Sequence, residues 1–244
     1  MKKLSSFTTI DTVYGPFIVN RHCHFHAEVL IKSGYPHIQD EIEKIQAILT
    51  TLPDNSVMID AGANIGLITV PAAQALQAKG GKVIAFEPQR AFAYALGGTC
   101  VLNELDNVVV NAVGLGADEH SKMIQLPNYN KPQDFGLFDL NSTHSDQGEK
   151  IEVVSIDSLK LPRLDFLKID VEGMDVEVLK GAAQAIKAYK PWCWVEYWKS
   201  DLEAIKTQFQ RLNYQFYKMD KLNLLCVPVD RPEAANVNVA ATSI

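Results

Sequence analysis

Four acidic side chains stand directly after short apolar runs, and they are the residues best placed to do chemistry. These acids are Asp60, Glu87, Asp170 and Glu196. Short apolar runs bounded by turns are typical of buried strands. In an open parallel sheet the carboxyl ends of the strands meet at one edge, and ligands bind there, near the point where the strand order reverses. The sequence therefore predicts one ligand site to which four strands contribute a carboxylate.

The first of these acids opens a glycine-containing turn that reads Asp60-Ala61-Gly62-Ala63-Asn64-Ile65-Gly66. Gly62 and Gly66 permit a sharp turn and a close approach to a ligand because they lack a Cβ. The helix expected after the turn favours an anionic group near its free N–H groups. A dinucleotide-binding loop reads Gly-x-Gly-x-x-Gly, whereas this loop reads Gly-x-Asn-x-Gly. The pattern therefore favours a ligand carboxylate over a pyrophosphate.

The second acid, Glu87, follows Asp60 by 27 residues and is followed by Pro88, which ends the strand. An acidic side chain at this position of a nucleotide-binding sheet accepts hydrogen bonds from ribose hydroxyls. A solvated glutamate at a strand end is the alternative. Its place after a matching glycine loop favours the ribose-binding role.

The third acidic position is a pair, Asp170 and Glu172, followed by Gly173. Alternate residues of an extended chain point to the same side, so the two carboxylates are expected to face one site, with Glu196 as a third acid. They could bind a ligand's amino group, accept a proton from a substrate hydroxyl, or hold a divalent cation such as Mg²⁺. We place the general-base role ahead of the metal role.

Strands and helices alternate from about residue 56, and this alternation predicts the elements that carry these acids. Strands are expected at 57–59, 82–86, 108–110, 166–169, 192–197, 214–218 and 223–229. Helices are expected at 38–52, 65–79, 89–103, 175–188 and 202–212. Repeated strand–helix units imply an α/β fold with a mainly parallel sheet and helices on both faces. The last two strands are joined by a short turn and should be antiparallel.

Three regions follow from this reading. Residues 1–54 form an N-terminal hairpin, turning at Tyr14-Gly15-Pro16, and a helix. Residues 55–230 form the ligand-binding domain, and residues 231–244 form a C-terminal tail. The turn-rich segment 114–150 is read as a hairpin with an extended loop inserted in that domain. Long loops in compact domains are often functional, so it is interpreted as a substrate lid, with a surface excursion as the alternative.

Composition excludes several classes of protein. The chain of 244 residues has a net charge of −6 without a basic stripe, which argues against a nucleic-acid partner. It has no apolar run of the roughly 18 residues that a membrane span needs. The N-terminus lacks the apolar region of a signal peptide, and the 4 cysteines are scattered. We therefore expect a cytoplasmic protein with reduced cysteines.

Two further groups of residues could have a functional role, but a structural role is favoured for each. His22, His24 and His26 alternate, and a strand would place them on one face. Alternate residues on a strand lie roughly 6.5–7 Å apart, too far for the outer pair to share a metal, so a polar strand face is favoured. Trp192 and Trp194 alternate in the same way and are expected in the core, apart from Trp198.

These motifs resemble those of the FkbM family of methyltransferases over about residues 55–198. VMIDAGANIG resembles the family's first cofactor motif, IAFEP its second, and FLKIDVEGMDVEVLKGA its most characteristic segment; VVSIDSL and PWCWVEYW also fit. The resemblance implies the seven-stranded class I (Rossmann-like) methyltransferase fold and S-adenosyl-L-methionine as cofactor. Its characterised members mainly O-methylate hydroxyls, including those of sugars.

The resemblance also implies a role for individual residues. Asp60, Gly62, Asn64 and Gly66 would hold the methionine part of the cofactor, and Glu87 with Pro88 the ribose. Asn111, Ala112 and Val113 would lie beside the adenine. Asp170 and Glu172 would face the transferred methyl, with Asp170 also near the cofactor's amino group.

The sequence thus predicts an S-adenosylmethionine-dependent methyltransferase acting on a hydroxyl of a small molecule or a saccharide. Asp170, Glu172 and Glu196 are its candidate catalytic residues. A nucleotide-dependent oxidoreductase and a non-catalytic cofactor-binding protein on the same fold are the alternatives. The methyl acceptor, the need for Mg²⁺ and the oligomeric state are left open.

Overall fold

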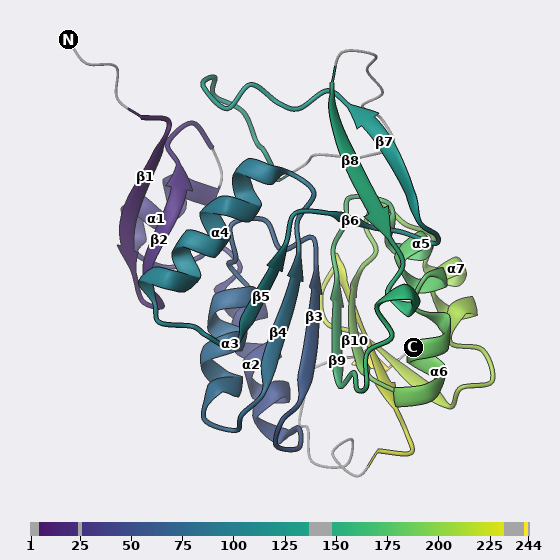
Figure 1. The fold of residues 1–244 in the computed structure, drawn as a ribbon. Coiled ribbons are helices and arrows are strands. Elements are labelled where there is room, and N and C mark those ends of the chain that lie inside the picture. The colour runs from purple at the N-terminus through teal and green to yellow at the C-terminus, as the bar shows by residue number, and fades with distance from the viewer. Residues whose placement is uncertain (1–4, 24–25, 137–147, 232–241, 244) are drawn as a thin grey trace.

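An eight-stranded sheet lies at the centre of the molecule, with the strand order β13-β11-β12-β10-β9-β3-β4-β5 (Figure 1). The computed structural model describes residues 5–23, 26–136, 148–231 and 242–243. The strands of this sheet are β3 (Val57–Ala61), β4 (Lys82–Phe86), β5 (Val108–Asn111), β9 (Phe166–Ile169), β10 (Trp192–Glu196), β11 (Tyr214–Lys218), β12 (Asn223–Pro228) and β13 (Thr242–Ser243). All seven predicted strands are therefore present, and β13 adds a two-residue strand at the edge.

The sheet is parallel from β5 through β4, β3 and β9 to β10, whereas β12, β11 and β13 pair antiparallel. Successive strands run outward from β3 to β4 and β5, and the chain then returns to β9 on the other side of β3. The strand order therefore reverses at β3. This arrangement confirms the predicted mainly parallel α/β sheet and its antiparallel closing pair.

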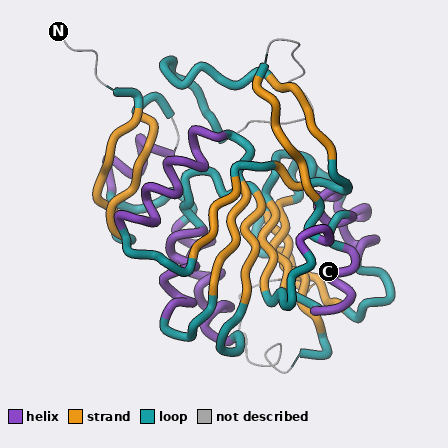
Figure 2. Tube along the Cα trace, viewed as in Figure 1, coloured by secondary structure: helices purple, strands orange, loops and turns teal. Residues whose placement is uncertain are grey.

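Helices cover both faces of this sheet (Figure 2). On one face lie α2 (Gln39–Thr51), α3 (Thr69–Gln77) and α4 (Arg90–Leu102), and on the other α5 (Asp175–Lys180), α6 (Ala183–Tyr189) and α7 (Leu202–Gln208). Each face has its own core, because alternate strand residues point to opposite sides. Met58 joins the first core and Ile59 the second. No helix among the described residues is long and apolar enough to cross a membrane.

The tryptophans of β10 lie in the first core. Trp192 and Trp194 are 1% and 0% exposed, so the predicted packing role of these two side chains is confirmed. Trp198 follows the strand and is 48% exposed. Trp198 is separated from the two buried rings because β10 ends at Glu196, so this third ring lies beyond the strand, at the carboxyl edge of the sheet.

The helix predicted from Ile65 begins only at Thr69. Asn64 and Gly66 adopt φ angles of 50° and 93°, and a right-handed helix does not contain such left-handed residues. The glycine loop is therefore longer than the sequence pattern indicates, and it runs on past Gly66 before the helix starts.

The helix predicted over 175–188 is divided into α5 and α6 at Gly181. A Cβ on Gly181 would lie 2.0 Å from the carbonyl oxygen of Gly116, so this glycine lets the helix pair pack directly against the segment that follows β5. The helix predicted over 202–212 is also shorter, because α7 ends at Gln208 and turns follow it.

The chain begins with a separate hairpin of β1 (Phe7–Thr12) and β2 (Gly15–Asn20), as the turn residues predict. It packs beside α4 (Figure 1). The backbone N–H of Ile18 donates to the Thr99 hydroxyl of that helix at 3.0 Å. The N-terminal hairpin therefore covers the outer side of α4, away from the middle of the sheet.

The strand predicted through the alternating histidines is wrong. The Asn20 side chain accepts a hydrogen bond from the backbone N–H of His22 at 2.8 Å, and such Asx turns change the chain direction. Helix α1 (His26–Ser33) then follows. His22 lies in the turn, His26 begins the helix, and His24 lies outside the described residues. His22 and His26 therefore do not lie on one strand.

The segment after β5 forms a second, small sheet. Its strands are β6 (Gly114–Leu115), β7 (His120–Ile124) and β8 (Glu149–Val154), in the order β6-β8-β7. Strands β7 and β8 pair antiparallel, which confirms the predicted hairpin. Residues 137–147 of its loop lie outside the described residues. The one-turn helix η1 (Asp157–Leu159) leads from this sheet towards β9.

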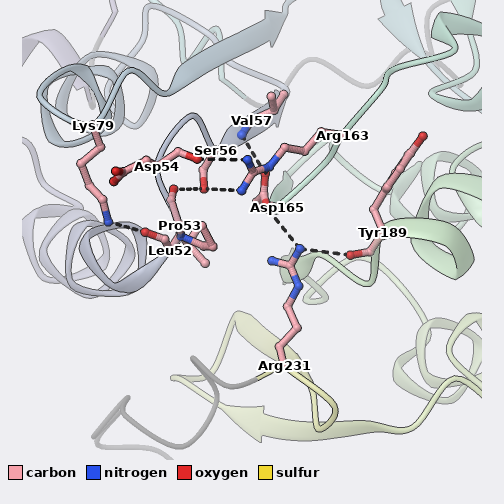
Figure 3. Close-up of polar contacts among 10 residues, drawn as sticks. All are labelled: Leu52, Pro53, Asp54, Ser56, Val57, Lys79, Arg163, Asp165, Tyr189 and Arg231. Atoms are coloured by element: carbon pink, nitrogen blue, oxygen red, sulfur yellow. Dashed lines mark hydrogen bonds and ion pairs between the residues drawn. The ribbon is translucent and has the colours of Figure 1, made fainter.

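A buried carboxylate, Asp165, fixes the amino end of β9 through several polar contacts (Figure 3). Asp165 is 0% exposed and accepts a hydrogen bond from the Val57 N–H at 2.9 Å. It pairs with Nε of Arg163 at 2.6 Å and with Nη2 of Arg231 at 3.0 Å. These contacts hold β3, β9 and the chain beyond β12 together, and so fix the register of the strands that carry the site.

Candidate functional site

A cavity of about 520 Å³ opens at the carboxyl ends of β3, β4, β9 and β10. Open α/β sheets bind ligands at this kind of position, where the strand order reverses. Eight carboxylates line the cavity, and the described lining residues include a single lysine and no arginine. The charged lining residues are Asp40, Glu41, Glu87, Asp134, Asp170, Glu172, Glu196, Asp220 and Lys168. The lining is therefore strongly acidic and favours ligands with cationic or hydroxyl groups.

The glycine loop forms one wall of this cavity. The backbone N–H groups of Gly62 and Ala63 both donate to the Phe86 carbonyl oxygen at 3.0 Å, which ties the loop to the end of β4. Gly62 has φ 78°, and a Cβ there would lie 1.8 Å from the Asp170 carbonyl oxygen. Gly62 is therefore required because the loop passes close to the end of β9. Gly62 and Asn64 both line the cavity.

Asp60 and Gly66 are not among the lining residues of the cavity. Asp60 is 0% exposed; its Oδ2 accepts a hydrogen bond from the Thr69 hydroxyl at 2.6 Å, and its Oδ1 lies 3.2 Å from Nζ of Lys168. A Cβ on Gly66 would lie 2.4 Å from Leu96 of α4. Both residues therefore support the loop from behind.

Glu87 lies at the end of β4, where it is 4% exposed and lines the cavity together with Pro88. Its Oε2 accepts from the Asn64 N–H and its Oε1 from the Gln89 N–H, each at 2.8 Å. Burial raises the pKa of Glu87 to about 7, against the lowering effect of these two bonds. A carboxylate has about four acceptor positions, so two remain for donors from a ligand.

The residues that the resemblance places beside the adenine lie behind Glu87. Asn111, Ala112 and Val113 are not among the lining residues, whereas Gly114 and Leu115 are. The Asn111 carbonyl oxygen accepts a hydrogen bond from the Glu87 N–H at 3.0 Å. Asn111 therefore holds the end of β4 in place, and the apolar wall beside it comes from the next two residues of the chain.

The three candidate catalytic acids come together in the same cavity. One carboxylate oxygen of Asp170, one of Glu172 and one of Glu196 lie within 4.8 Å of one another. Glu172 adopts φ 57°, and Gly173, with φ 94°, completes the turn into α5. The predicted convergence of these acids is therefore confirmed. It depends on β9 and β10 being parallel neighbours.

The three carboxylates differ in their partners. Asp170 lies 3.5 Å from Nζ of Lys168, and Glu172 forms an ion pair with Lys199. Glu196 accepts a hydrogen bond from the indole N–H of Trp198 at 2.9 Å. Burial, followed by the neighbouring Asp170 carboxylate, raises the pKa of Glu196 well above its usual range. Of these three carboxyl groups, Glu196 is therefore the one most favoured to carry a proton at neutral pH.

The same three oxygens are also close enough together to hold a divalent cation. Oxygen ligands of this kind suit Mg²⁺ or Ca²⁺. Lys168 and Lys199 already offset the charge of Asp170 and Glu172, and their ammonium groups would oppose a cation bound between them. The arrangement therefore favours proton transfer over metal binding, and the metal role stays an alternative.

Five of the charged residues that line the cavity were not assigned a role from the sequence: Asp40, Glu41, Asp134, Lys168 and Asp220. Lys168 is 3% exposed and stands within the apolar run of β9, an unusual place for a lysine that could have drawn attention to it. Glu41 lies four residues before Ile45, on the apolar stripe of the predicted helix, and this unusual place for a glutamate was a sequence signal that was not used. Burial raises the pKa of Glu41 to about 7, and its helix brings it to the cavity from outside the strand–loop motifs.

The segment 114–150 lies beside the Glu87 loop as well as over the cavity. The Gln89 side chain donates to the Phe135 carbonyl oxygen at 3.0 Å and accepts from the Tyr129 hydroxyl at 3.1 Å. Tyr129 and Phe135 also contact each other through their rings, 5.4 Å apart. The described part of this segment therefore also contacts the loop that holds Glu87, through Gln89, whose backbone N–H donates to that carboxylate; its interpretation as a substrate lid stays a prediction.

Comparison with known proteins agrees with this geometry. The model of the methyltransferase FkbM domain matches residues 60–221. Methyltransferase 1 of Beauveria bassiana is 26% identical over 149 residues, which are 53% of this chain and 59% of that protein. The chain thus spans somewhat over half the length of the curated relative that it matches.

Two solved structures are similar in fold. The crystal structure of the methyltransferase FkbM from Methylobacillus flagellatus has a TM-score of 0.54 at 20% identity, covering 83% of this chain and 55% of that one. A putative rRNA-methylase from Clostridium thermocellum has a TM-score of 0.50 at 10% identity, covering 75% of this chain and 92% of that one. The family match extends from Asp60 of the glycine loop to the turn between β11 and β12. On this ground the chain belongs to the FkbM methyltransferase family.

Proposed function

We propose that the protein is an S-adenosylmethionine-dependent methyltransferase that methylates a hydroxyl group of a small molecule or a saccharide. The strongest support for this proposal comes from the residues that line one cavity. A single cavity brings the glycine loop and Glu87, which suit a nucleoside carrying an amino acid, together with three converging carboxylates. The family match favours this function over a nucleotide-dependent oxidoreductase.

The donor set of the cavity fits the proposed cofactor. Glu87 offers two remaining acceptor positions at the end of β4, which suit the two hydroxyls of a ribose. The loop of Gly62 and Asn64 would hold the methionine part, and the Asp170 carboxylate its ammonium group. Leu115 and Phe86 supply apolar surface on the side where Asn111, Ala112 and Val113 support the wall for the adenine.

The cofactor would supply an electrophilic methyl group, which is displaced in line by the acceptor oxygen. The residues of the chain align the two partners and exclude water, which is the main requirement of such a displacement. Asp170, Glu172 and Glu196 stand where they could take the proton of the acceptor hydroxyl. Glu196 ionises more readily when a cation occupies the cavity, because an opposite charge favours the carboxylate.

The charge of the cavity also bears on the acceptor. Eight lining carboxylates beside a single lysine would repel the phosphates of a nucleic acid, which binding proteins usually neutralise with lysine and arginine. Trp198 presents a half-exposed ring at the cavity, next to Glu196. An aromatic ring beside hydrogen-bonding carboxylates suits an uncharged, hydroxyl-rich acceptor, which supports the small-molecule or saccharide proposal over a nucleic acid.

Calorimetric titration with S-adenosylhomocysteine and with NAD tests the proposed function directly. We expect the wild-type protein to bind S-adenosylhomocysteine and not NAD. Glu87→Ala should weaken this binding by roughly 1.5–3 kcal/mol, the scale of hydrogen bonds to a charged group. Glu119→Ala is the matched control, because Glu119 is an exposed glutamate that does not line the cavity. Binding of NAD without S-adenosylhomocysteine would replace the proposal with the oxidoreductase alternative.

A further inference from the structure

Lys168 occupies an unusual position for a lysine. It is 3% exposed and lies within the parallel pairing of β9 with β3, directly opposite Asp60. Burying an ammonium group is costly unless charged and hydrogen-bonding partners compensate for the lost water. The partners of Lys168 therefore indicate why a lysine is retained in a strand that otherwise reads Phe-Leu-Ile.

These partners belong to the two structures that build the cofactor side of the cavity. Nζ of Lys168 donates to the Gly62 carbonyl oxygen at 3.1 Å and lies 3.2 Å from Oδ1 of Asp60, at the start of the glycine loop. It also lies 3.5 Å from Oδ2 of Asp170 at the end of β9. One ammonium group thus joins the loop to the strand end that carries the catalytic acids.

Backbone contacts between loop and strand end are close but do not orient the Asp170 carboxylate. The Asp170 N–H donates to the Ala61 carbonyl oxygen at 3.1 Å, and the Gly62 Cα packs onto the Asp170 carbonyl. The side chain of Asp170 is 38% exposed. Its carboxylate is held by two side-chain contacts, the ion pair with Lys168 on the loop side and a hydrogen bond with the Glu196 carboxyl group on the β10 side. Burial lowers the pKa of Lys168, but the Asp60 and Asp170 carboxylates outweigh this effect and raise it above its usual range. The lysine is therefore charged whenever the site operates.

We propose that Lys168 is a positioning residue that sets the geometry of the methionine-binding half of the cofactor site, by holding the Gly62 carbonyl and the Asp170 carboxylate in fixed relation. This inference rests on the proposed function, in which the Gly62 loop and Asp170 hold the amino-acid part of the cofactor. Among the described residues Glu87 has no hydrogen bond or ion pair with Lys168; its two oxygens accept from the backbone N–H groups of Asn64 and Gln89. The ribose and adenine half should therefore not depend on Lys168.

Two ligands separate these halves. S-Adenosylhomocysteine contains the nucleoside and the amino acid, whereas 5′-methylthioadenosine contains the nucleoside without the amino acid. We expect Lys168→Met to raise the Kd of S-adenosylhomocysteine about tenfold or more, the effect of losing a hydrogen bond to a charged group. The Kd of 5′-methylthioadenosine should stay within about twofold of wild type, because this ligand lacks the amino acid. A tenfold change in Kd corresponds to roughly 1.4 kcal/mol, and a twofold change is much smaller than that. Lys168→Arg should recover part of the lost affinity, because it restores the charge.

Lys180→Met is the control, because Lys180 forms an exposed ion pair with Glu177 on α5 and does not line the cavity. It should leave both affinities unchanged. If Lys168→Met fails to fold, Asp60→Asn combined with Lys168→Met removes both charges of the buried pair and keeps its shape. The double variant should show the same selective loss for S-adenosylhomocysteine.

Calorimetry of both ligands with these variants distinguishes a failure of the proposed function from a failure of the role proposed for Lys168. A wild-type protein that binds neither ligand contradicts the proposed function itself. If the wild type binds both ligands, the variant decides the role of Lys168. An equal loss of affinity for both ligands in Lys168→Met would mean that Lys168 only maintains the fold. The double variant gives the same test if the single variant does not fold. Unchanged affinity for S-adenosylhomocysteine would exclude any role for it in the site. Selective loss with partial recovery in Lys168→Arg is the result that the structure leads us to expect.

Discussion

Replacing Glu87 by glutamine removes an ionisable group that the fold buries at the end of β4. Glu87 is 4% exposed, and burial raises its pKa from 4.5 to about 7. A carboxyl group whose pKa is raised on folding adds stability that is fully present below its unfolded pKa and is lost as the pH rises through its folded pKa. The relevant window for this protein therefore runs from about pH 4.5 to about pH 7.

The size of the effect follows from that shift. One unit of pKa corresponds to about 1.4 kcal/mol, so the wild-type protein should lose about 2–3 kcal/mol of unfolding free energy through this group between pH 5 and pH 8. Glutamine keeps one acceptor oxygen, but its NH₂ group faces one of the two N–H donors from Asn64 and Gln89. A lost hydrogen bond costs about 1–2 kcal/mol at every pH. The variant should thus be less stable than the wild type at pH 5 and at least as stable at pH 8.

Urea unfolding at the two pH values measures this difference, with the slope of each curve checked for two-state behaviour. Glu119→Gln, at an exposed position, is the matched control and should follow the wild-type pH profile. The other buried acids remain in all three proteins, so their contributions cancel in the comparison. If the stabilities of Glu87→Gln and the wild type change in parallel from pH 5 to pH 8, burial does not raise the pKa of Glu87 and the reasoning is refuted.

Four further outcomes are expected. The affinity of the wild type for S-adenosylhomocysteine should rise as the pH passes about 7, where Glu87 ionises, and calorimetry of Glu87→Gln should show a smaller rise, because Glu41 still ionises in the same range. Glu172→Gln and Glu196→Gln should each lower the rate of methyl transfer by roughly 10²–10⁴-fold, measured with labelled donor over a panel of hydroxylated acceptors; full activity in both would remove them from the mechanism. Chelation should leave this rate unchanged, and loss restored by Mg²⁺ would assign the acids to a metal. Tyr129→Phe removes the hydrogen bond to the Gln89 amide oxygen and should raise the Kd of S-adenosylhomocysteine about two- to tenfold; an unchanged Kd would separate the 114–150 segment from the cofactor site.

The order and type of the main elements could be predicted from the sequence because they follow from local patterns. Short apolar runs gave the strands, and the spacing of acids at their ends gave the edge at which a ligand binds. Boundaries were less well predicted wherever a tertiary contact sets the backbone conformation. The late start of α3 depends on left-handed residues at Asn64 and Gly66. The break between α5 and α6 depends on the contact of Gly181 with Gly116, which no local pattern contains.

The candidate site divides in the same way. Glu87, Asp170, Glu172 and Glu196 could be located from the sequence alone, because each lies at or just beyond the end of an apolar run and parallel strands bring such ends together. Asp60 was correctly placed at a strand end, but its burial behind the loop was not predictable. Its partners, Thr69 and Lys168, come from two different elements.

The sequence by itself determined the fold class, the edge of the sheet that holds the site and four of the acids that line it, Glu87, Asp170, Glu172 and Glu196, since these depend on periodicity and on residues close together in the chain. Only the tertiary structure decided which of those acids are paired. Lys168 and Lys199 offset Asp170 and Glu172, while Glu196 is bonded to the indole N–H of Trp198 and to the Asp170 carboxylate and forms no ion pair with a lysine among the described residues. The charge state of a carboxyl group depends on its burial and on the ions within a few ångströms, and both are set by packing between strands and helices that are distant in the sequence.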